Sequence, residues 1–338
     1  MKFIKKFIAI SMAGAALAIA VLVFKLLSFQ HGSVTLPESE QVFLISPGSN
    51  IKSIAQDMTR RGIIDDPWLF ILLAKLKDVE TRVRAGEYLL EAGQTPDNLL
   101  ETFTTGKSIQ YGFTVIEGWS FRQMMDALAE EPVIMHTLQG KSDAEIMRAI
   151  GYPDQHPEGM FFPDTYRFPK GTTDADFLKR AYDVMQQHLE REWLQREPDL
   201  PLNSSYEALI LASIIEKETA VGSERPLIAG VFTERLRRNM RLQTDPTIIY
   251  GLGSGFDGDI RFRDLKKDTP YNTYLHAGLT PTPIALPGLD SIRAALHPEP
   301  TEALYFVSKG DGTHHFSATL EEHNAAVARY QLKRRKKN

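Results

Sequence analysis

Hydrophobic positions along the chain separate one long apolar span from a body in which short apolar runs and helical patterns alternate. Residues 7–24, FIAISMAGAALAIAVLVF, carry no charge and are just long enough to form a helix that crosses a bilayer. Residues 28–40 are polar and predict a tether. Beyond them, apolar runs such as QVFLI alternate with segments whose apolar residues recur every three or four positions. The pattern predicts an α+β fold with a single amino-terminal transmembrane helix, a small module and a larger mixed α+β domain.

The first folded segment predicts a strand, two helices and a second strand. Residues 51–64 place apolar side chains at helical spacing, Asp66-Pro67 begins a second helix, and AGEYLLEAG reads as the returning strand. This order is that of the glycan-binding LysM module, so residues 41–108 are predicted to be LysM-like. A generic α+β packing unit with the same order remains the alternative.

Charges around the apolar span predict its orientation. Lys2, Lys5 and Lys6 precede the span, which favours a cytoplasmic amino terminus and places the body outside the cytoplasm, facing the cell wall in a bacterium. The alternative is a signal peptide cleaved after Ala16-Leu17-Ala18, but cleavage there would leave a strongly apolar new terminus.

Composition excludes several kinds of ligand. Nine of the 39 basic residues lie in the first 25 positions and the tail 333–337, which leaves 30 basic against 43 acidic residues in 26–332, a net charge of −13. A body of that sign is a poor partner for nucleic acid. The chain has no cysteine, so disulfides and thiolate chemistry are excluded, and no glycine-rich phosphate loop occurs. We expect no cofactor.

Two glutamates lie near the end of the most apolar helix of the body, predicted over YEALILASIIEKETA (206–220). Side chains two positions apart on a helix point in opposed directions, so Glu216 and Glu218 cannot serve one site together. Glu218 follows Ile214 and Ile215 by one turn, whereas Glu216 follows Ala212 and Ser213. Glu218 is therefore the carboxyl expected to be desolvated and to hold a proton near neutral pH, as a general acid must. The alternative is that both glutamates are ion-paired.

Two further features leave alternatives open. The loop 151–171 carries Phe161, Phe162, Tyr166 and Phe168, whose rings could stack on a sugar or could simply be buried. His314 and His315 are adjacent on a predicted hairpin strand and point to opposite faces, so we expect no metal site there.

Six motifs in order along the chain resemble the bacterial endolytic murein transglycosylases, the YceG-like family. They are EGMFFPDTY (158–166), ASIIEKET (212–219), MRLQTDPTIIYG (240–251), YNTY (271–274), PIALPG (283–288) and AALHP (294–298). The resemblance covers most of residues 40–330 and is weakest in the tether, the LysM-like module and the loop 253–264. The sequence pattern predicts a cytoplasmic stub (1–6), a transmembrane helix (7–27), a tether (28–40) and the LysM-like module (41–108), and the resemblance implies a catalytic transglycosylase domain over residues 109–338.

The resemblance also implies an activity. Nascent peptidoglycan glycan strands would be cut internally between N-acetylmuramic acid and N-acetylglucosamine, with Glu218 as the catalytic acid and 1,6-anhydro ends as products, which would limit strand elongation. Such an enzyme sits in the cell inner membrane with a periplasmic body, and penicillin-binding proteins are candidate partners. Substrate-positioning residues are expected among Gln243, Asp245, Tyr271, Asn272 and Tyr274.

Two other functions remain open at this point. A muramidase would need a second carboxylate beside Glu218, with Asp245 or Asp164 as candidates. A non-catalytic wall-binding scaffold would need only the aromatic loops and the LysM-like module.

Overall fold

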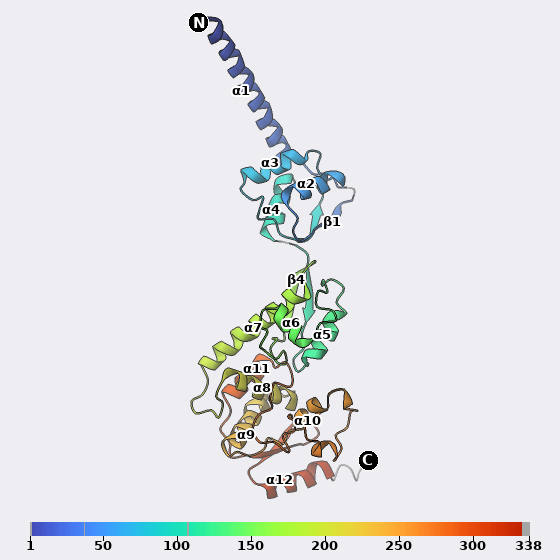
Figure 1. The fold of residues 1–338 in the computed structure, drawn as a ribbon, viewed down its shortest axis with the longest axis vertical. Coiled ribbons are helices and arrows are strands. Elements are labelled where there is room, and N and C mark those ends of the chain that lie inside the picture. The colour runs from blue at the N-terminus through green and yellow to red at the C-terminus, as the bar shows by residue number, and fades with distance from the viewer. Residues whose placement is uncertain (1, 37, 107, 333–338) are drawn as a thin grey trace. The chain divides into compact units, whose positions relative to one another are not determined.

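A computed structural model describes residues 2–36, 38–106 and 108–332, so the basic carboxyl-terminal tail lies outside the described residues. The chain forms two compact units, one of residues 1–112 and 167–172 and the other of residues 113–166 and 173–338. Two of the three boundaries, 112/113 and 166/167, fall within the paired strands β3 (Gln110–Thr114) and β4 (Thr165–Pro169). The mixed α+β class expected from the sequence is confirmed (Figure 1).

The first unit begins with α1 (Lys2–His31), whose segment Lys6–His31 is apolar and long enough to cross a membrane. It continues through β1 (Glu40–Ile45), α2 (Ile51–Arg60), α3 (Pro67–Leu76), β2 (Gly86–Glu91) and α4 (Pro96–Thr105). Strands β1 and β2 pair antiparallel, with Val42 opposite Leu89. Side-chain caps start each of the three short helices, from Asn50, Asp66 and Thr95.

One hydrophobic core holds this unit together. Phe43, Phe70, Tyr88 and Phe103 are almost completely buried in it. The stretch 28–40, expected as a plain tether, is partly structured, because α1 continues to His31 and Val34 enters the core, where its N–H donates to the Gln94 carbonyl over 2.8 Å.

The second unit is mostly helical. Its elements are α5 (Phe121–Ala129), α6 (Asp143–Ala149), α7 (Asp174–Leu194), α8 (Ser205–Glu218), η1 (Gly222–Glu224), α9 (Arg225–Arg237), α10 (Asp245–Leu252), η2 (Gly253–Gly255), η3 (Asp264–Lys266), α11 (Leu289–Leu296), β5 (Tyr305–Ser308), β6 (His314–Ser317), α12 (Leu320–Val327) and η4 (Ala328–Leu332). Strands β5 and β6 form the predicted hairpin.

Helix α8 is the centre of this unit and packs against α7, α9, α10 and α11 (Figure 1). Every residue from Ala208 to Ile215 is buried, as expected for a helix that is apolar on nearly all faces. The hydroxyl of Ser204 caps its start by accepting the Glu207 N–H over 3.2 Å. Burial of the whole helix fixes where its carboxyl-terminal end, and so Glu218, must lie.

The aromatic residues of the loop 151–171 are core residues. Phe161, Phe162, Tyr166 and Phe168 are each less than 9% exposed, and Phe161 stacks on Phe121 with ring centroids 5.3 Å apart. Burial therefore accounts for these rings, and they offer no stacking platform for a sugar.

Candidate active site

The two glutamates at the end of α8 have different surroundings, as the helical geometry predicts. Glu216 is an ion-paired structural carboxylate: Oε1 accepts from Arg225 over 3.1 Å, and Oε2 accepts from the Gly288 N–H (3.0 Å) and the Ser291 hydroxyl (2.7 Å). These bonds tie α8 to the first turn of α11. The ion-pair alternative therefore holds for Glu216.

Glu218 is the last residue of α8, and its only hydrogen-bond donor among the described side chains is the Thr244 hydroxyl, which donates to Oε1. Thr219 after it is extended and turns the chain away from the helix. Burial, reinforced by the nearby negative charge of Asp245, raises the pKa of Glu218 to about 7. The Thr244 bond and the positive fields of His314 and Arg235 oppose that rise without cancelling it. Glu218 can therefore hold a proton at neutral pH and also release it.

The segment before α10 is shaped to bring Thr244 to Glu218. The buried guanidinium of Arg235 donates to the carbonyls of Leu242 and Leu304, each over 2.6 Å. Gln243 adopts a left-handed backbone with φ of 50°, which is unfavourable for a residue with a side chain, and its N–H donates to the Thr273 carbonyl over 3.1 Å. Such strain commonly marks functional segments.

Three of the residues predicted to position substrate are brought to the neighbourhood of Glu218. Asp245 opens α10, and its Oδ1 accepts from the Tyr274 hydroxyl over 2.6 Å. Burial and the charges of Asp245 and Glu218 raise the pKa of Tyr274, so this hydroxyl remains a proton donor. Gln243 is exposed beside this pair. Together with Glu218 they form a small cluster of oxygen and amide groups.

Asn272 and Tyr271 take different roles. Asn272 is 1% exposed, and its amide donates to the carbonyls of Leu265 (3.1 Å) and Lys267 (2.8 Å), so it braces the 265–274 loop. The hydroxyl of Tyr271 bonds the Thr282 hydroxyl over 2.9 Å, and its ring meets Tyr250 edge to face with ring centroids 4.8 Å apart.

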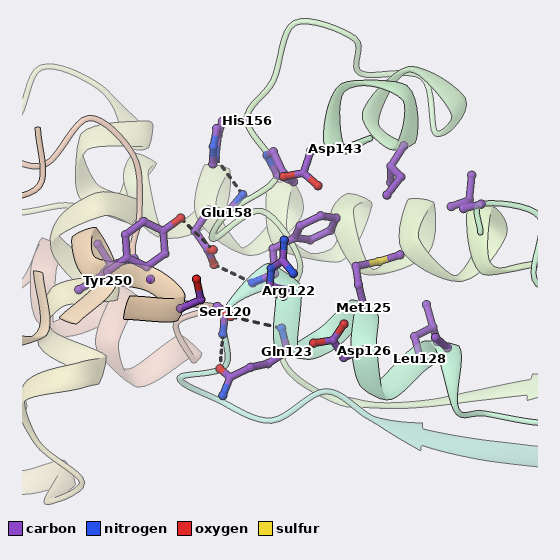
Figure 2. Close-up of a pocket in the computed structure, with 18 of the residues that line it drawn as sticks. Ser120, Arg122, Gln123, Met125, Asp126, Leu128, Asp143, His156, Glu158 and Tyr250 are labelled. Carbon is purple, nitrogen blue, oxygen red and sulfur yellow. Dashed lines mark hydrogen bonds between the residues drawn. The ribbon is translucent and has the colours of Figure 1, made fainter. Parts of the chain in front are cut away.

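A second carboxyl with a raised pKa lies at the far end of α10, and the sequence did not single it out. Glu158 is 4% exposed, and burial raises its pKa to about 7. Its oxygens accept from the Phe121 N–H over 2.9 Å and the Tyr250 hydroxyl over 3.1 Å, bonds visible in Figure 2. Gly159 beside it has a φ of 80°, and a Cβ there would overlap Pro283. Only its place in the EGMFFPDTY motif could have signalled Glu158.

Glu158, Tyr250 and Tyr271 line a cavity of about 1040 Å³ in the second unit, whereas Glu218, Asp245 and Tyr274 are not among its lining residues. Residues of α5, α6, α10 and the 156–158 segment line it, among them Arg122, Glu158 and Tyr250 (Figure 2). Lys217 and Pro246, the chain neighbours of Glu218 and Asp245, line it as well. Its volume is at the upper end of the range of about 300–1,000 Å³ that is usual for ligand pockets.

Two other predicted candidates lie elsewhere. Asp164 is exposed before β4, and its side chain accepts a hydrogen bond from the Thr165 N–H. Of the two candidate carboxylates, Asp245 is the one whose charge raises the pKa of Glu218. His314 is hydrogen-bonded to Glu224 through Nδ1 over 2.7 Å, and within the described part of the chain no group of three or more histidine and carboxylate side chains could hold a metal ion.

Comparison with known proteins identifies the family. The model of the YceG-like family matches residues 43–329. The chain belongs to the YceG-like family.

Two relatives of this YceG-like chain are named as enzymes. A protein of Bacillus subtilis (strain 168), named endolytic murein transglycosylase, is 34% identical over 303 residues, with 85% of this chain and 83% of that protein covered. A protein of the same name from Streptococcus pneumoniae serotype 2 (strain D39) is 28% identical over 321 residues, covering 85% of this chain and 57% of that protein.

A solved structure agrees with this assignment. The 2.6 Å crystal structure of a yceG-like protein from Listeria monocytogenes matches with a TM-score of 0.54 and 29% identity, covering 85% of this chain and 98% of that one. The family and the lytic transglycosylase class expected from the motifs are confirmed. Peptidoglycan is the substrate that membership of this YceG-like family implies.

Proposed function

We propose that this protein is a membrane-anchored endolytic lytic transglycosylase that cuts nascent peptidoglycan strands between N-acetylmuramic acid and N-acetylglucosamine. The observation that carries the proposal is the state of Glu218. It is a carboxyl with a pKa near 7, bonded to the Thr244 hydroxyl, and it has no ion-pair partner among the described residues. It can therefore donate a proton and take one back at neutral pH.

A single carboxyl suffices for this reaction. Glu218 protonates the glycosidic oxygen, and the resulting carboxylate then removes the proton of the muramic C6 hydroxyl. The C6 oxygen closes on C1, which breaks the chain and leaves a 1,6-anhydro end. Because the nucleophile belongs to the same sugar, the protein needs only to position that sugar and stabilise an oxocarbenium-like state.

The residues around Glu218 fit a positioning role. Gln243 and the Asp245–Tyr274 pair offer exposed or partly exposed polar groups beside it, and their polar atoms suit sugar hydroxyls and N-acetyl groups. Asn272 stabilises the loop that carries Tyr274, because its amide donates to the Lys267 carbonyl and its Oδ1 accepts from the Tyr274 N–H. Tyr271 contributes further along, where its ring lines the cavity.

The remaining parts of the proposal concern location. The apolar segment of α1 would anchor the protein in the inner membrane, with the amino terminus in the cytoplasm and the body in the periplasm. Residues 41–108 would act as a LysM-like glycan-binding module, supported by the order β1, α2, α3, β2. Placement beside the membrane would give access to strands as penicillin-binding proteins make them, so cleavage would limit strand elongation.

Cleavage in ¹⁸O-labelled water tests the chemistry. Uncrosslinked strands cut by the full-length protein should give fragments without the label, each lighter by one water than a hydrolysis product, and Glu218→Gln should give no fragments. Stoichiometric label at the new reducing end would overturn the single-carboxyl mechanism. It would instead favour a muramidase in which Asp245 activates water.

A further inference from the structure

The cavity lined by Glu158 and Tyr250 also carries charged side chains that the proposed chemistry does not use. Arg122 and Lys141 contribute exposed cations from α5 and from the segment before α6, and Asp126 and Asp143 contribute exposed carboxylates (Figure 2). Lys217, next to Glu218, adds a third cation and donates to the Gly118 carbonyl over 3.0 Å.

Arg122 and Lys141 are free to bind a ligand. Within the described residues, neither Arg122 nor Lys141 makes a side-chain hydrogen bond or an ion pair with a carboxylate. The remaining carboxyls of the wall are already engaged: Asp174 accepts from the Thr137 and Leu138 N–H groups, and Glu158 from Tyr250. Unpaired cations and the carboxylates of Asp126 and Asp143 therefore both line the cavity, and a concave wall concentrates the fields of both on whatever enters it.

The charge of the lining indicates which part of the substrate the cavity fits. The sugar chain of peptidoglycan is neutral, because its amino groups are acetylated and the lactyl carboxyl is in an amide bond. All charge of an uncrosslinked strand lies on its peptide branches, which carry more carboxylates than amines. These branches leave the muramic residue, and that sugar is the one that Glu218 would attack.

We propose that this cavity binds the peptide branch of the muramic residue next to the bond that is cut. This inference rests on the proposed function. Arg122 and Lys141 receive the carboxylates of the branch through charge-assisted hydrogen bonds, and Asp126 and Asp143 face its amine. Lys217 and Pro246, the chain neighbours of Glu218 and Asp245, line the cavity, so a branch bound in it would leave a sugar chain held near Glu218. The enzyme would then select peptide-bearing strands.

The test compares two substrates with the full-length protein in detergent: uncrosslinked peptide-bearing strands, and the same strands after an amidase has removed the peptides. The wild type should show a KM about tenfold lower for the peptide-bearing strands. Arg122→Ala combined with Lys141→Ala should bring the ratio of the two KM values close to one. A control that removes two cations outside the cavity, Arg148→Ala with Lys309→Ala, should keep the wild-type ratio.

Three results would overturn the inference. Equal KM values for both substrates in the wild type would show that the branch is not bound. A KM that rises by the same factor for both substrates in the double variant would assign the cavity to the sugar chain, and KM values that stay at the wild-type level for both substrates would remove Arg122 and Lys141 from the site. Failure of the wild type to cut either substrate would instead overturn the proposed function, and this inference with it.

Discussion

Replacing Glu218 with glutamine should stabilise the folded protein at alkaline pH while abolishing cleavage. Burial and the charge of Asp245 hold the pKa of Glu218 at about 7, against an ordinary value of 4.5. Glutamine has nearly the same shape, and its amide oxygen can still accept the Thr244 hydroxyl. It carries no charge at any pH, so the cost of ionising a carboxyl at this position disappears.

The sign and size of the change in the free energy of unfolding follow from the linkage between protonation and folding. A carboxyl whose pKa is raised on folding contributes its full stability below the unfolded pKa and loses that contribution as the pH rises through the folded pKa. The window here runs from pH 4.5 to about 7. A difference of about 2.5 pH units at 1.36 kcal/mol each sets an upper limit of about 3.4 kcal/mol. Because the Glu218 side chain is partly exposed, we expect about 1–3 kcal/mol.

Thermal unfolding from pH 4 to pH 8.5, followed by circular dichroism, measures this effect. The Tm of Glu218→Gln should match the wild type at pH 4 and exceed it at pH 8, by about 2–4 °C per kcal/mol. Glu190→Gln, at an exposed position of α7, is the matched control and should show no pH-dependent difference. A Tm difference between Glu218→Gln and the wild type that does not change with pH would refute the reasoning.

Four further outcomes are expected. Glu216→Gln should lower the free energy of unfolding by about 2–4 kcal/mol in chemical denaturation, because it breaks a buried ion pair, while the folded fraction keeps its kcat. Asp245→Asn should lower the pKa of Glu218 by removing a neighbouring negative charge, so the alkaline limb of the kcat/KM profile for strand cleavage should move to lower pH; an unmoved limb would contradict the assigned field. Tyr250→Phe should cost about 1–3 kcal/mol in the same denaturation assay at pH 8, because its buried carboxylate partner loses a donor. Ser33→Cys should react with an impermeant thiol reagent in intact spheroplasts if the body is periplasmic; absence of labelling would contradict the proposed topology.

Sequence reasoning succeeded where the deciding geometry is local. The opposed directions of Glu216 and Glu218 follow from helix periodicity, and their different partners, Arg225 and Thr244, confirm it. The β5–β6 hairpin likewise follows from a turn between two short apolar runs. Helix α8 could be recognised as a core helix because it is apolar on nearly all faces.

The sequence could not predict features that depend on contacts between distant segments. Glu158 gains its raised pKa from burial, which outweighs the opposing hydrogen bonds from the Phe121 N–H and from the hydroxyl of Tyr250, which lies 92 positions away. Asn272 looks like a substrate ligand in the YNTY motif, yet its amide is used by backbone carbonyls. The rings of Phe161 and Phe162 follow no helical or strand period, so their burial is decided only when α7 packs against them.

Helix α10 connects these observations, because a residue at each of its ends donates a hydrogen bond to a carboxyl group whose pKa is near 7. Thr244, the residue before its first turn, donates to Glu218, and Tyr250 in its last turn donates to Glu158. The helix is only eight residues long, so tertiary bonds rather than its own hydrogen bonds must hold it in place. Asp245 at its start acts electrostatically on Glu218, and its side with Pro246, Ile249 and Tyr250 forms a wall of the cavity. The same short helix therefore sets the field on the proposed acid and shapes the space beside it, which explains how segments as distant as EGMFFPDTY and ASIIEKET contribute to one site.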